Sequence, residues 1–124
     1  MGADTAKRRQ VVDRYFEGFR RGDHDAVLDC LADDVVWDIV GVKRLVGKAD
    51  FDAEIENEQF EGQPELAVER LVADGEHLVA LGEGRGRLRD GGGFSFAFCT
   101  AFEFAGEAIA RVRSYIVALT PRPG

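Results

Sequence analysis

The first half of the chain has the hydrophobic spacing of helices. Apolar side chains recur at intervals of three and four residues along 5–20, which predicts a helix with one buried face. Two shorter helices are predicted over 24–31 and 48–59. Between them, the run VVWDIV at 35–40 is short and rich in β-branched residues, which predicts one early strand followed by a loop up to Gly47.

From Pro64 onward the spacing of apolar residues changes to a period of two. Strands are predicted over four ranges: 65–73, 76–88, 94–104 and 109–119. Turn-forming sequences separate them: Asp74-Gly75, the glycine-rich 89–93, and 105–107. This order of elements predicts a single α+β domain over 1–124, in which a curved antiparallel sheet packs with one face against three N-terminal helices.

The predicted strand 94–104 has the strongest pattern. Its phenylalanines alternate with small residues and therefore share one face, which we expect to point at the helices: Phe94, Phe96, Phe98, Phe102 and Phe104. Thr100 is the polar residue of that row, and a buried hydroxyl needs a partner. On the last strand Val112, Ser114 and Ile116 share a face, and antiparallel pairing should bring Ser114 close to Thr100.

The strand 76–88 is expected to contribute to the same interior. Val79 and Leu81 would form an apolar base, and Glu83, Arg85 and Arg87 would follow on the same face as a charged rim. This gradient predicts a conical pocket that is open at one end. The alternative is a strand that runs out into solvent with its charges paired.

The opposite sheet face is predicted to be built from small residues, with Leu78 and Val117 nearby: Ala80, Gly82, Gly84, Ala97, Cys99 and Ala101. No helix remains to cover this face, and small side chains let a second layer approach closely. We therefore expect a homodimer packed through the outer sheet face.

Composition excludes several classes of partner and cofactor. The chain has 124 residues with 16 basic and 23 acidic side chains, and this net charge of -7 disfavours nucleic acid and anionic membranes. The polar start MGADTAKRRQ has no apolar signal core, so a cytoplasmic location is expected. The two cysteines and two histidines lack metal-site spacing, and no glycine motif for phosphate is present, so no metal and no cofactor are expected.

Two segments carry a family resemblance. Residues 15–47, YFEGFRRGDHDAVLDCLADDVVWDIVGVKRLVG, resemble the SnoaL-like branch of the nuclear-transport-factor-2-like superfamily, and 102–116, FEFAGEAIARVRSYI, resemble its final hairpin. The resemblance implies the cone-shaped fold. It does not select one activity, because the family includes ketosteroid isomerases, polyketide cyclases, epoxide hydrolases and binding domains without catalysis.

The resemblance also implies roles for particular residues. Tyr15 falls at the tyrosine that bonds the oxyanion in ketosteroid isomerases. Three acidic positions of the family are occupied here by other residues: Ile39, Thr100 and Ser114. Asp38 lies next to the first of these positions, but strand alternation turns it outward unless a bulge rotates it.

Three functions remain open. The first is a cofactor-free isomerase or cyclase acting on a hydrophobic carbonyl compound, with Tyr15 as oxyanion donor and Asp38 or Glu83 as base. The second is a non-catalytic pocket for a small apolar molecule, in which Glu83 and Arg85 orient its polar end. Its expected lining is Trp37, Ile39, Phe96, Phe98, Thr100, Val112, Ser114 and Ile116. The third is a structural dimerisation domain, in which Tyr15 and Trp37 are core residues.

Overall fold

The computed structural model describes residues 2–55 and 60–119, which form three helices and six strands. The helices are α1 (Gly2–Arg21), α2 (His24–Leu28) and α3 (Gly47–Ile55). The strands are β1 (Leu31–Ile39), β2 (Lys43–Val46), β3 (Phe60–Asp74), β4 (His77–Leu88), β5 (Gly93–Ala105) and β6 (Ala108–Ala118).

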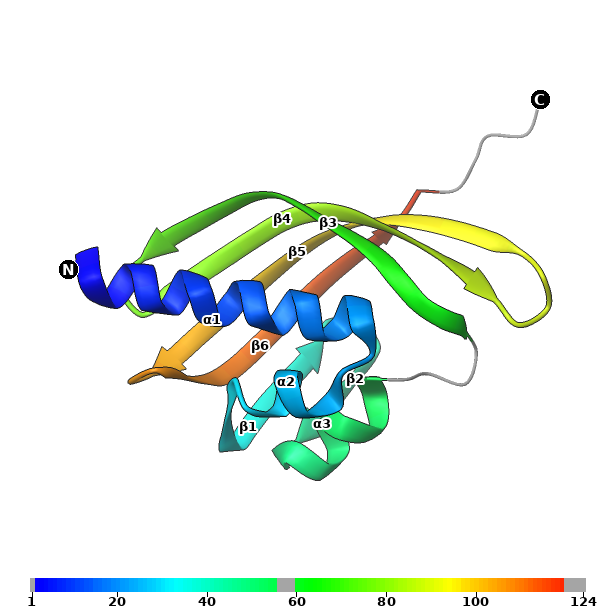
Figure 1. Ribbon diagram of the computed structural model, residues 1–124. Helices are drawn as coiled ribbons and strands as arrows, with labels where there is room; N and C mark the ends of the chain where they lie inside the picture. The colour runs from blue at the N-terminus through cyan, green and yellow to red at the C-terminus, as the bar shows by residue number, and fades with distance from the viewer. Residues whose placement is uncertain (1, 56–59, 120–124) are drawn as a thin grey trace.

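The six strands form one curved sheet in the order β2-β1-β6-β5-β4-β3, and all three helices lie on its concave side (Figure 1). The strands from β3 to β6 are joined as an antiparallel meander. β1 runs parallel to β6, so the sheet is mixed and not purely antiparallel. The α+β class and the curved sheet wrapped on N-terminal helices are confirmed.

Three boundaries in the first half differ from the sequence prediction. The second helix stops at Leu28, because Leu31 already pairs with Ile109 in the sheet. The predicted loop before Gly47 contains β2, a short edge strand that pairs with β1. The third helix ends at Ile55, and the remaining predicted positions, 56–59, lie outside the described residues.

The phenylalanine face of β5 points at the helices, as predicted. Phe98, Phe102 and Phe104 are each at most 6% exposed. The ring of Phe102 meets that of Tyr15 edge to face, with their centroids 5.0 Å apart. Aromatic pairs of this geometry stabilise a core beyond the area that they bury.

The predicted orientation of β4 is wrong, because its even residues face the core. Leu78 and Ala80 are fully buried, and Gly82, Gly84 and Gly86 follow them on the inner face, each paired with a phenylalanine of β5. A Cβ atom on Gly82 would lie 2.8 Å from the Phe98 ring, which is closer than van der Waals contact allows. The rings therefore need glycine on the neighbouring strand.

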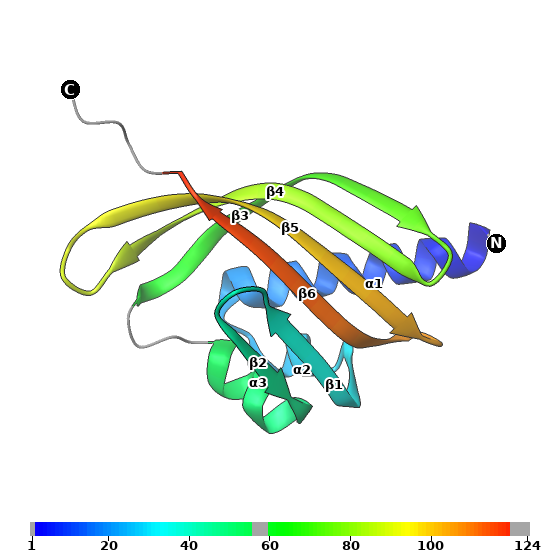
Figure 2. The ribbon, with the colours of Figure 1, turned by 180° about the vertical axis from the view of Figure 1, so that it is seen from behind.

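As a consequence, the odd residues of β4 lie on the outer face. The predicted apolar base of Val79 and Leu81 and the rim of Glu83, Arg85 and Arg87 are not part of the interior. Likewise, Leu78, Ala80, Gly82 and Gly84 do not belong to the outer face. Figure 2 shows this outer face from behind, and no described helix covers it.

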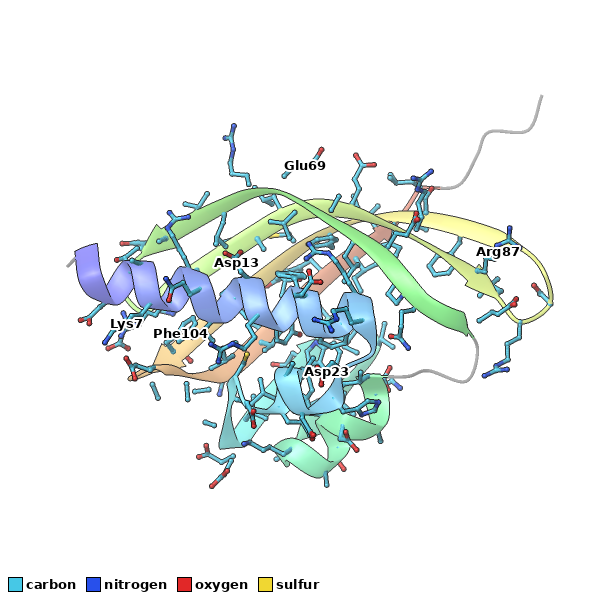
Figure 3. All side chains as sticks on the ribbon, in the orientation of Figure 1. Lys7, Asp13, Asp23, Glu69, Arg87 and Phe104 are labelled. Carbon is cyan, nitrogen blue, oxygen red and sulfur yellow. The ribbon has the colours of Figure 1, made fainter. Side chains whose placement is uncertain are left out.

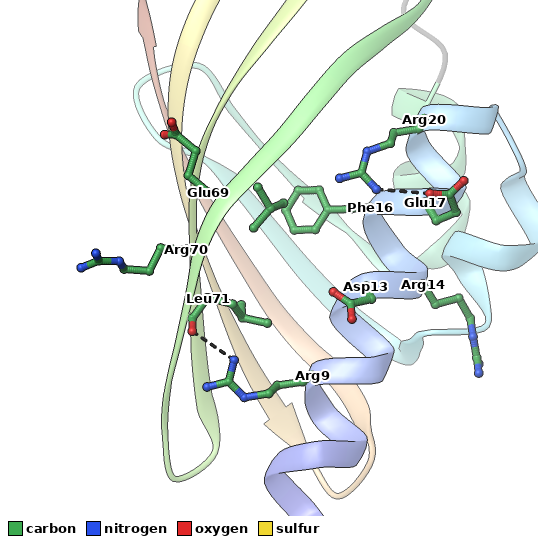
Figure 4. A pocket seen from close by; sticks show the side chains of 10 residues that line it. Arg9, Asp13, Arg14, Phe16, Glu17, Arg20, Glu69, Arg70 and Leu71 are labelled. Atoms are coloured by element: carbon green, nitrogen blue, oxygen red, sulfur yellow. Dashed lines mark hydrogen bonds and ion pairs between the residues drawn. The ribbon is translucent and has the colours of Figure 1, made fainter.

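Arginines of α1 fasten this helix to the free edge of the sheet. Arg9 Nη1 donates to the carbonyl of Leu71 at 3.1 Å (Figure 4). Arg20 Nε donates to the carbonyl of Leu66 at 2.7 Å. β3 is an edge strand, and its carbonyls on that side have no strand neighbour. These bonds give two carbonyls of the edge strand a hydrogen-bond donor, and they hold α1, with Tyr15, over the sheet.

Candidate functional site

A cavity of about 200 Å³ lies between the helices and the inner face of the sheet. Figure 3 shows the described side chains on the ribbon, including those between the helices and the sheet. Most of its walls are aromatic or aliphatic. The lining residues are Tyr15, Phe16, Phe19, Trp37, Ile39, Glu54, Ile55, Gly62, Pro64, Leu66, Phe96, Phe98, Thr100, Ser114 and Ile116.

Two hydroxyls lie side by side on the sheet wall of this cavity. Thr100 of β5 pairs directly with Ser114 of β6, which pairs in turn with Ile39 of β1. Pairing partners project from the same face of a sheet, so these three side chains form one row. Val112 belongs to the neighbouring row and is fully buried; it packs below the cavity and does not line it.

Ser114 is oriented by Trp37. The indole Nε1–H of Trp37 donates to Ser114 Oγ at 3.0 Å, and this bond is buried. A hydroxyl has one proton to donate and accepts through its lone pairs. Because Trp37 is donor only, Ser114 must be the acceptor, and its own proton remains available for another group.

Tyr15 reaches the cavity from α1 and is 3% exposed. Burial raises the pKa of its phenol well above the ordinary value, so the hydroxyl stays protonated and acts as a donor. No residue in 2–55 or 60–119 accepts a hydrogen bond from Tyr15, Thr100 or Ser114. The cavity wall therefore has three hydroxyls, of Tyr15, Thr100 and Ser114, whose donor capacity the described chain leaves unused.

Asp38 lies outside the cavity. Its neighbours Trp37 and Ile39 point inward, and the Asp38 carboxylate is bonded by Arg44 Nε of β2 at 2.6 Å. This hydrogen bond is the main reason that the pKa of Asp38 is held below its usual value. Without an inward rotation, Asp38 does not reach a molecule in the cavity.

Glu83 and Arg85 also lie outside the cavity, on the outer face of β4. Both side chains are exposed, and Arg85 Nε approaches Glu65 Oε2 at 3.5 Å. The expectation that they form its polar rim is wrong, because β4 turns its glycines inward. From the sequence, this strand could also run out into solvent with its charges paired, and this alternative describes Arg85 better.

Glu54 is the carboxylate that lines the cavity among the described residues, and sequence reasoning missed it. It follows Phe51 by three positions and precedes Ile55, and both of these neighbours are buried. Lys43 Nζ of β2 bonds Glu54 Oε1 at 2.9 Å, and the Glu54 side chain is only 17% exposed. The spacing from Phe51 to Glu54 to Ile55 was a readable signal, because residues three and four apart share a helix face.

A second hollow between α1 and β3 is wide open to solvent (Figure 4). Phe16, Val68 and Leu71 form its apolar part, and charged residues of α1 stand around it. Arg20 is bonded to Glu17 at 3.3 Å as well as to β3. Arg9 and Arg20 are thus held by bonds within the protein, and the lining of this hollow is more polar than that of the cavity.

The described part of the chain contains no cluster of three His, Cys, Asp or Glu side chains that could hold a metal ion. In the same residues, no helix is both long and apolar enough to cross a membrane.

Several solved structures have the same fold as this chain. A nuclear-transport-factor-2-like protein of unknown function from Burkholderia pseudomallei has 23% identity and a TM-score of 0.82, over 88% of this chain and 89% of its own. An LEH-like epoxide hydrolase from M. tuberculosis has 22% identity and a TM-score of 0.79, over 90% and 83%. A Xanthomonas campestris protein provisionally described as a polyketide cyclase has 25% identity and a TM-score of 0.80, over 89% and 90%.

A search of curated proteins found no match. The family model of the SnoaL-like domain, in contrast, matches residues 12–112, which include the cavity walls from Tyr15 to Thr100. The chain belongs to the SnoaL-like domain family and shares the fold of solved nuclear-transport-factor-2-like proteins.

Proposed function

We propose that this protein binds a compact, largely apolar small molecule that carries a hydrogen-bond-accepting oxygen. The observation that supports this proposal is the set of buried hydroxyls on the cavity wall, Tyr15, Thr100 and Ser114, which find no acceptor among the described residues. A hydroxyl that faces the cavity can donate to a ligand carbonyl, and such a hydrogen bond contributes about 1 kcal/mol.

The cavity volume limits the size of the ligand. Binding sites for drug-sized molecules span about 300–1,000 Å³, and a dry engineered cavity of about 150 Å³ holds benzene. A volume of about 200 Å³ therefore suits one ring with a few substituents.

A matched pair of probes tests the polar recognition. Acetophenone and α-methylstyrene have the same shape, but only acetophenone has an acceptor oxygen. One hydrogen bond contributes about 1 kcal/mol, so we expect acetophenone to bind about fivefold more tightly, measured by calorimetry or by titration of amide NMR signals.

Variants locate the effect on the cavity wall. Tyr15→Phe and Thr100→Val keep the shape of the side chain and remove a hydroxyl, so each should reduce the preference for acetophenone. Ser95→Ala is the control, because the Ser95 hydroxyl bonds the Leu119 carbonyl instead. Absence of saturable binding by both probes would refute the proposal, and equal binding of both probes would refute its polar part.

Catalysis as a cofactor-free isomerase or cyclase is the second candidate, and Tyr15 favours it. A protonated phenol in a low-dielectric site stabilises the negative charge that develops on a carbonyl oxygen. The three acidic positions of the family hold Ile39, Thr100 and Ser114, and Asp38 lies outside, so no base comes from these positions. Turnover of a monocyclic enone that is lost in Tyr15→Phe would support this candidate.

The outer sheet face is proposed to join two copies of the chain. An apolar band crosses it, and beside the band the exposed Arg111 of β6 lies in one row of the register with the acidic Asp74 of β3. The band consists of Val72, Val79, Leu81, Cys99, Tyr115 and Val117. A two-fold axis along β5 would place Tyr115 over the partner's Leu81 and Arg111 near the partner's Asp74.

A further inference from the structure

We infer that the ligand binds with its acceptor oxygen at the inner end of the cavity and with an apolar tail that leaves through the cavity mouth beside Ile116. The preferred class is therefore a ketone whose carbonyl lies next to one end of an apolar chain. This inference rests on the proposed function and specifies its ligand class. It depends on three features of the sheet wall: a closed inner end, a row of hydroxyls, and an apolar mouth.

Exposure along the inner face of β5 and β6 shows which end of the cavity is closed. Three successive inward-facing pairs join the two strands: Phe102 with Val112, Thr100 with Ser114, and Phe98 with Ile116. The first pair is fully buried and the hydroxyl pair is at most 6% exposed, whereas Ile116 is 53% exposed. The closed end therefore lies at the first pair, and the mouth lies beside Ile116.

Other residues of the inner face show the same direction. On β5, which runs antiparallel to β6, Phe96 is more exposed than the deeper Phe98 and Phe102. On β1, which runs parallel to β6, Trp37 is buried and Ile39 is only partly buried. The mouth therefore lies where β1 and β6 end and β5 begins. At this end the β4–β5 hairpin extends past the last turn of α1 (Figure 1).

The closed end leaves little room beyond the hydroxyls. Neither Phe102 nor Val112 lines the cavity, and the ring of Tyr15, which does, packs edge to face against that of Phe102. A protein core is packed as densely as an organic crystal, so it does not admit a further chain. A ligand oxygen bonded by Thr100 or Ser114 therefore carries only a small group, such as methyl, on its inner side.

The strand side of the mouth is apolar, and Ile116 and Phe96 line it. Successive inward residues of a strand are about 7 Å apart, so a hexyl chain attached at the hydroxyl row reaches Ile116. Covering Ile116 removes an exposed apolar side chain from water. The carboxylate of the lining, Glu54, comes from α3 and is bonded by Lys43 at 2.9 Å. The strand side of the mouth therefore favours a hydrocarbon tail.

Two isomeric ketones test the orientation. Methyl hexyl ketone and propyl butyl ketone have the same composition, but only the first has its carbonyl next to a chain end. The second cannot bring its oxygen to the hydroxyls without placing a propyl group in the closed end. It therefore loses about one hydrogen bond, and we expect methyl hexyl ketone to bind about fivefold more tightly, measured by calorimetry.

Intermolecular NOEs measure the direction of the bound ketone independently of its affinity. The acetyl methyl group of methyl hexyl ketone should show NOEs to the methyl groups of Val112. The terminal methyl group of its hexyl chain should show NOEs to the methyl groups of Ile116. NOEs in the reverse order would overturn the inference.

The variant Ile116→Thr tests the mouth. It keeps the β-branched shape that suits a strand and removes apolar surface from the mouth. The advantage of methyl hexyl ketone over methyl propyl ketone should fall about fourfold, which is the contribution of one buried methylene group. Val117→Thr is the matched control and should leave this advantage unchanged, because Val117 is the next residue of β6, is exposed and does not line the cavity.

The outcomes separate this inference from the proposed function. If acetophenone binds more tightly than α-methylstyrene but the two isomeric ketones bind equally, the orientation is refuted and the cavity proposal stands. The same conclusion follows if Ile116→Thr keeps the full advantage of the longer chain. If no ketone shows saturable binding, the proposed function itself fails.

Discussion

Glycine at alternate positions of β4 determines how closely the phenylalanine rings of β5 lie against the sheet. Gly82 pairs with Phe98, and Gly84 pairs with Phe96. Both phenylalanines line the cavity. The missing side chains on β4 therefore give the aromatic wall its position, and the cavity owes part of its volume to them.

The substitution Gly82→Ala tests this arrangement. The added Cβ atom would collide with the Phe98 ring and with the backbone carbonyl of Ala67. Overpacking of this kind costs about 1–3 kcal/mol of unfolding free energy, which urea denaturation measures. Glu83→Ala, at the next and outward-facing position, should stay within about 0.5 kcal/mol of the parent. Equal stability of the two variants would contradict the described packing.

The helices and β1 of the first half share the hydrophobic core, whereas ion pairs tie the edge strand β2 to its neighbours. β2 is a short edge strand whose side chains are mostly exposed, and the bond from Arg44 to Asp38 ties it to β1. This bond makes the stability that β2 and β1 contribute to the fold depend on pH. The sign of the dependence follows from the lowered pKa of Asp38.

Because the pKa of Asp38 is lower in the folded protein than in the unfolded chain, the stabilisation is complete above the ordinary aspartate pKa of 3.8 and is lost as pH falls through the folded value. Asp38→Asn should therefore lower the urea midpoint at neutral pH and converge with the parent in acid. Arg44→Gln should reproduce this pattern. A difference that is constant across pH would show that the ion pair is not its cause.

Alternation along single strands was a reliable guide wherever large side chains fill one face. The phenylalanines of β5 placed Thr100 inward, and the register then brought Ser114 opposite it. The same reasoning failed on β4, because charge and side-chain size pointed to the odd residues, whereas the rings of β5 require glycine inside. β2 was missed because four residues carry too short a pattern, and with it the partner of Glu54, Lys43, was missed as well.

At the scale of the whole molecule, the uncovered outer face carries the proposed contact between two copies. Leu81 and Tyr115 are 38% and 41% exposed there, and Val117 is 63% exposed. Cys99 lies between Leu81 and Tyr115 in the register. A dimer would bury these apolar side chains, which a monomer leaves in contact with water.

Light scattering coupled to size exclusion tests this assembly. We expect a particle of twice the 13.6 kDa chain mass, and Leu81→Glu should convert it to the monomer. Val42→Glu is the control, because Val42 is 70% exposed in the turn between β1 and β2 and lies away from the apolar band. Alkylation of Cys99 should slow as protein concentration rises; a monomer at all concentrations would contradict the proposal.

The parallel pairing of β1 with β6 has a consequence for how the chain folds. Residues near position 37 find their strand neighbours near position 112, so this contact closes a long loop. Such distant pairings slow folding, because the entropy of loop closure is lost before the contact forms. On the ribosome, β1 must wait for β6 to emerge, and until then the first helices leave their apolar faces open to chaperones.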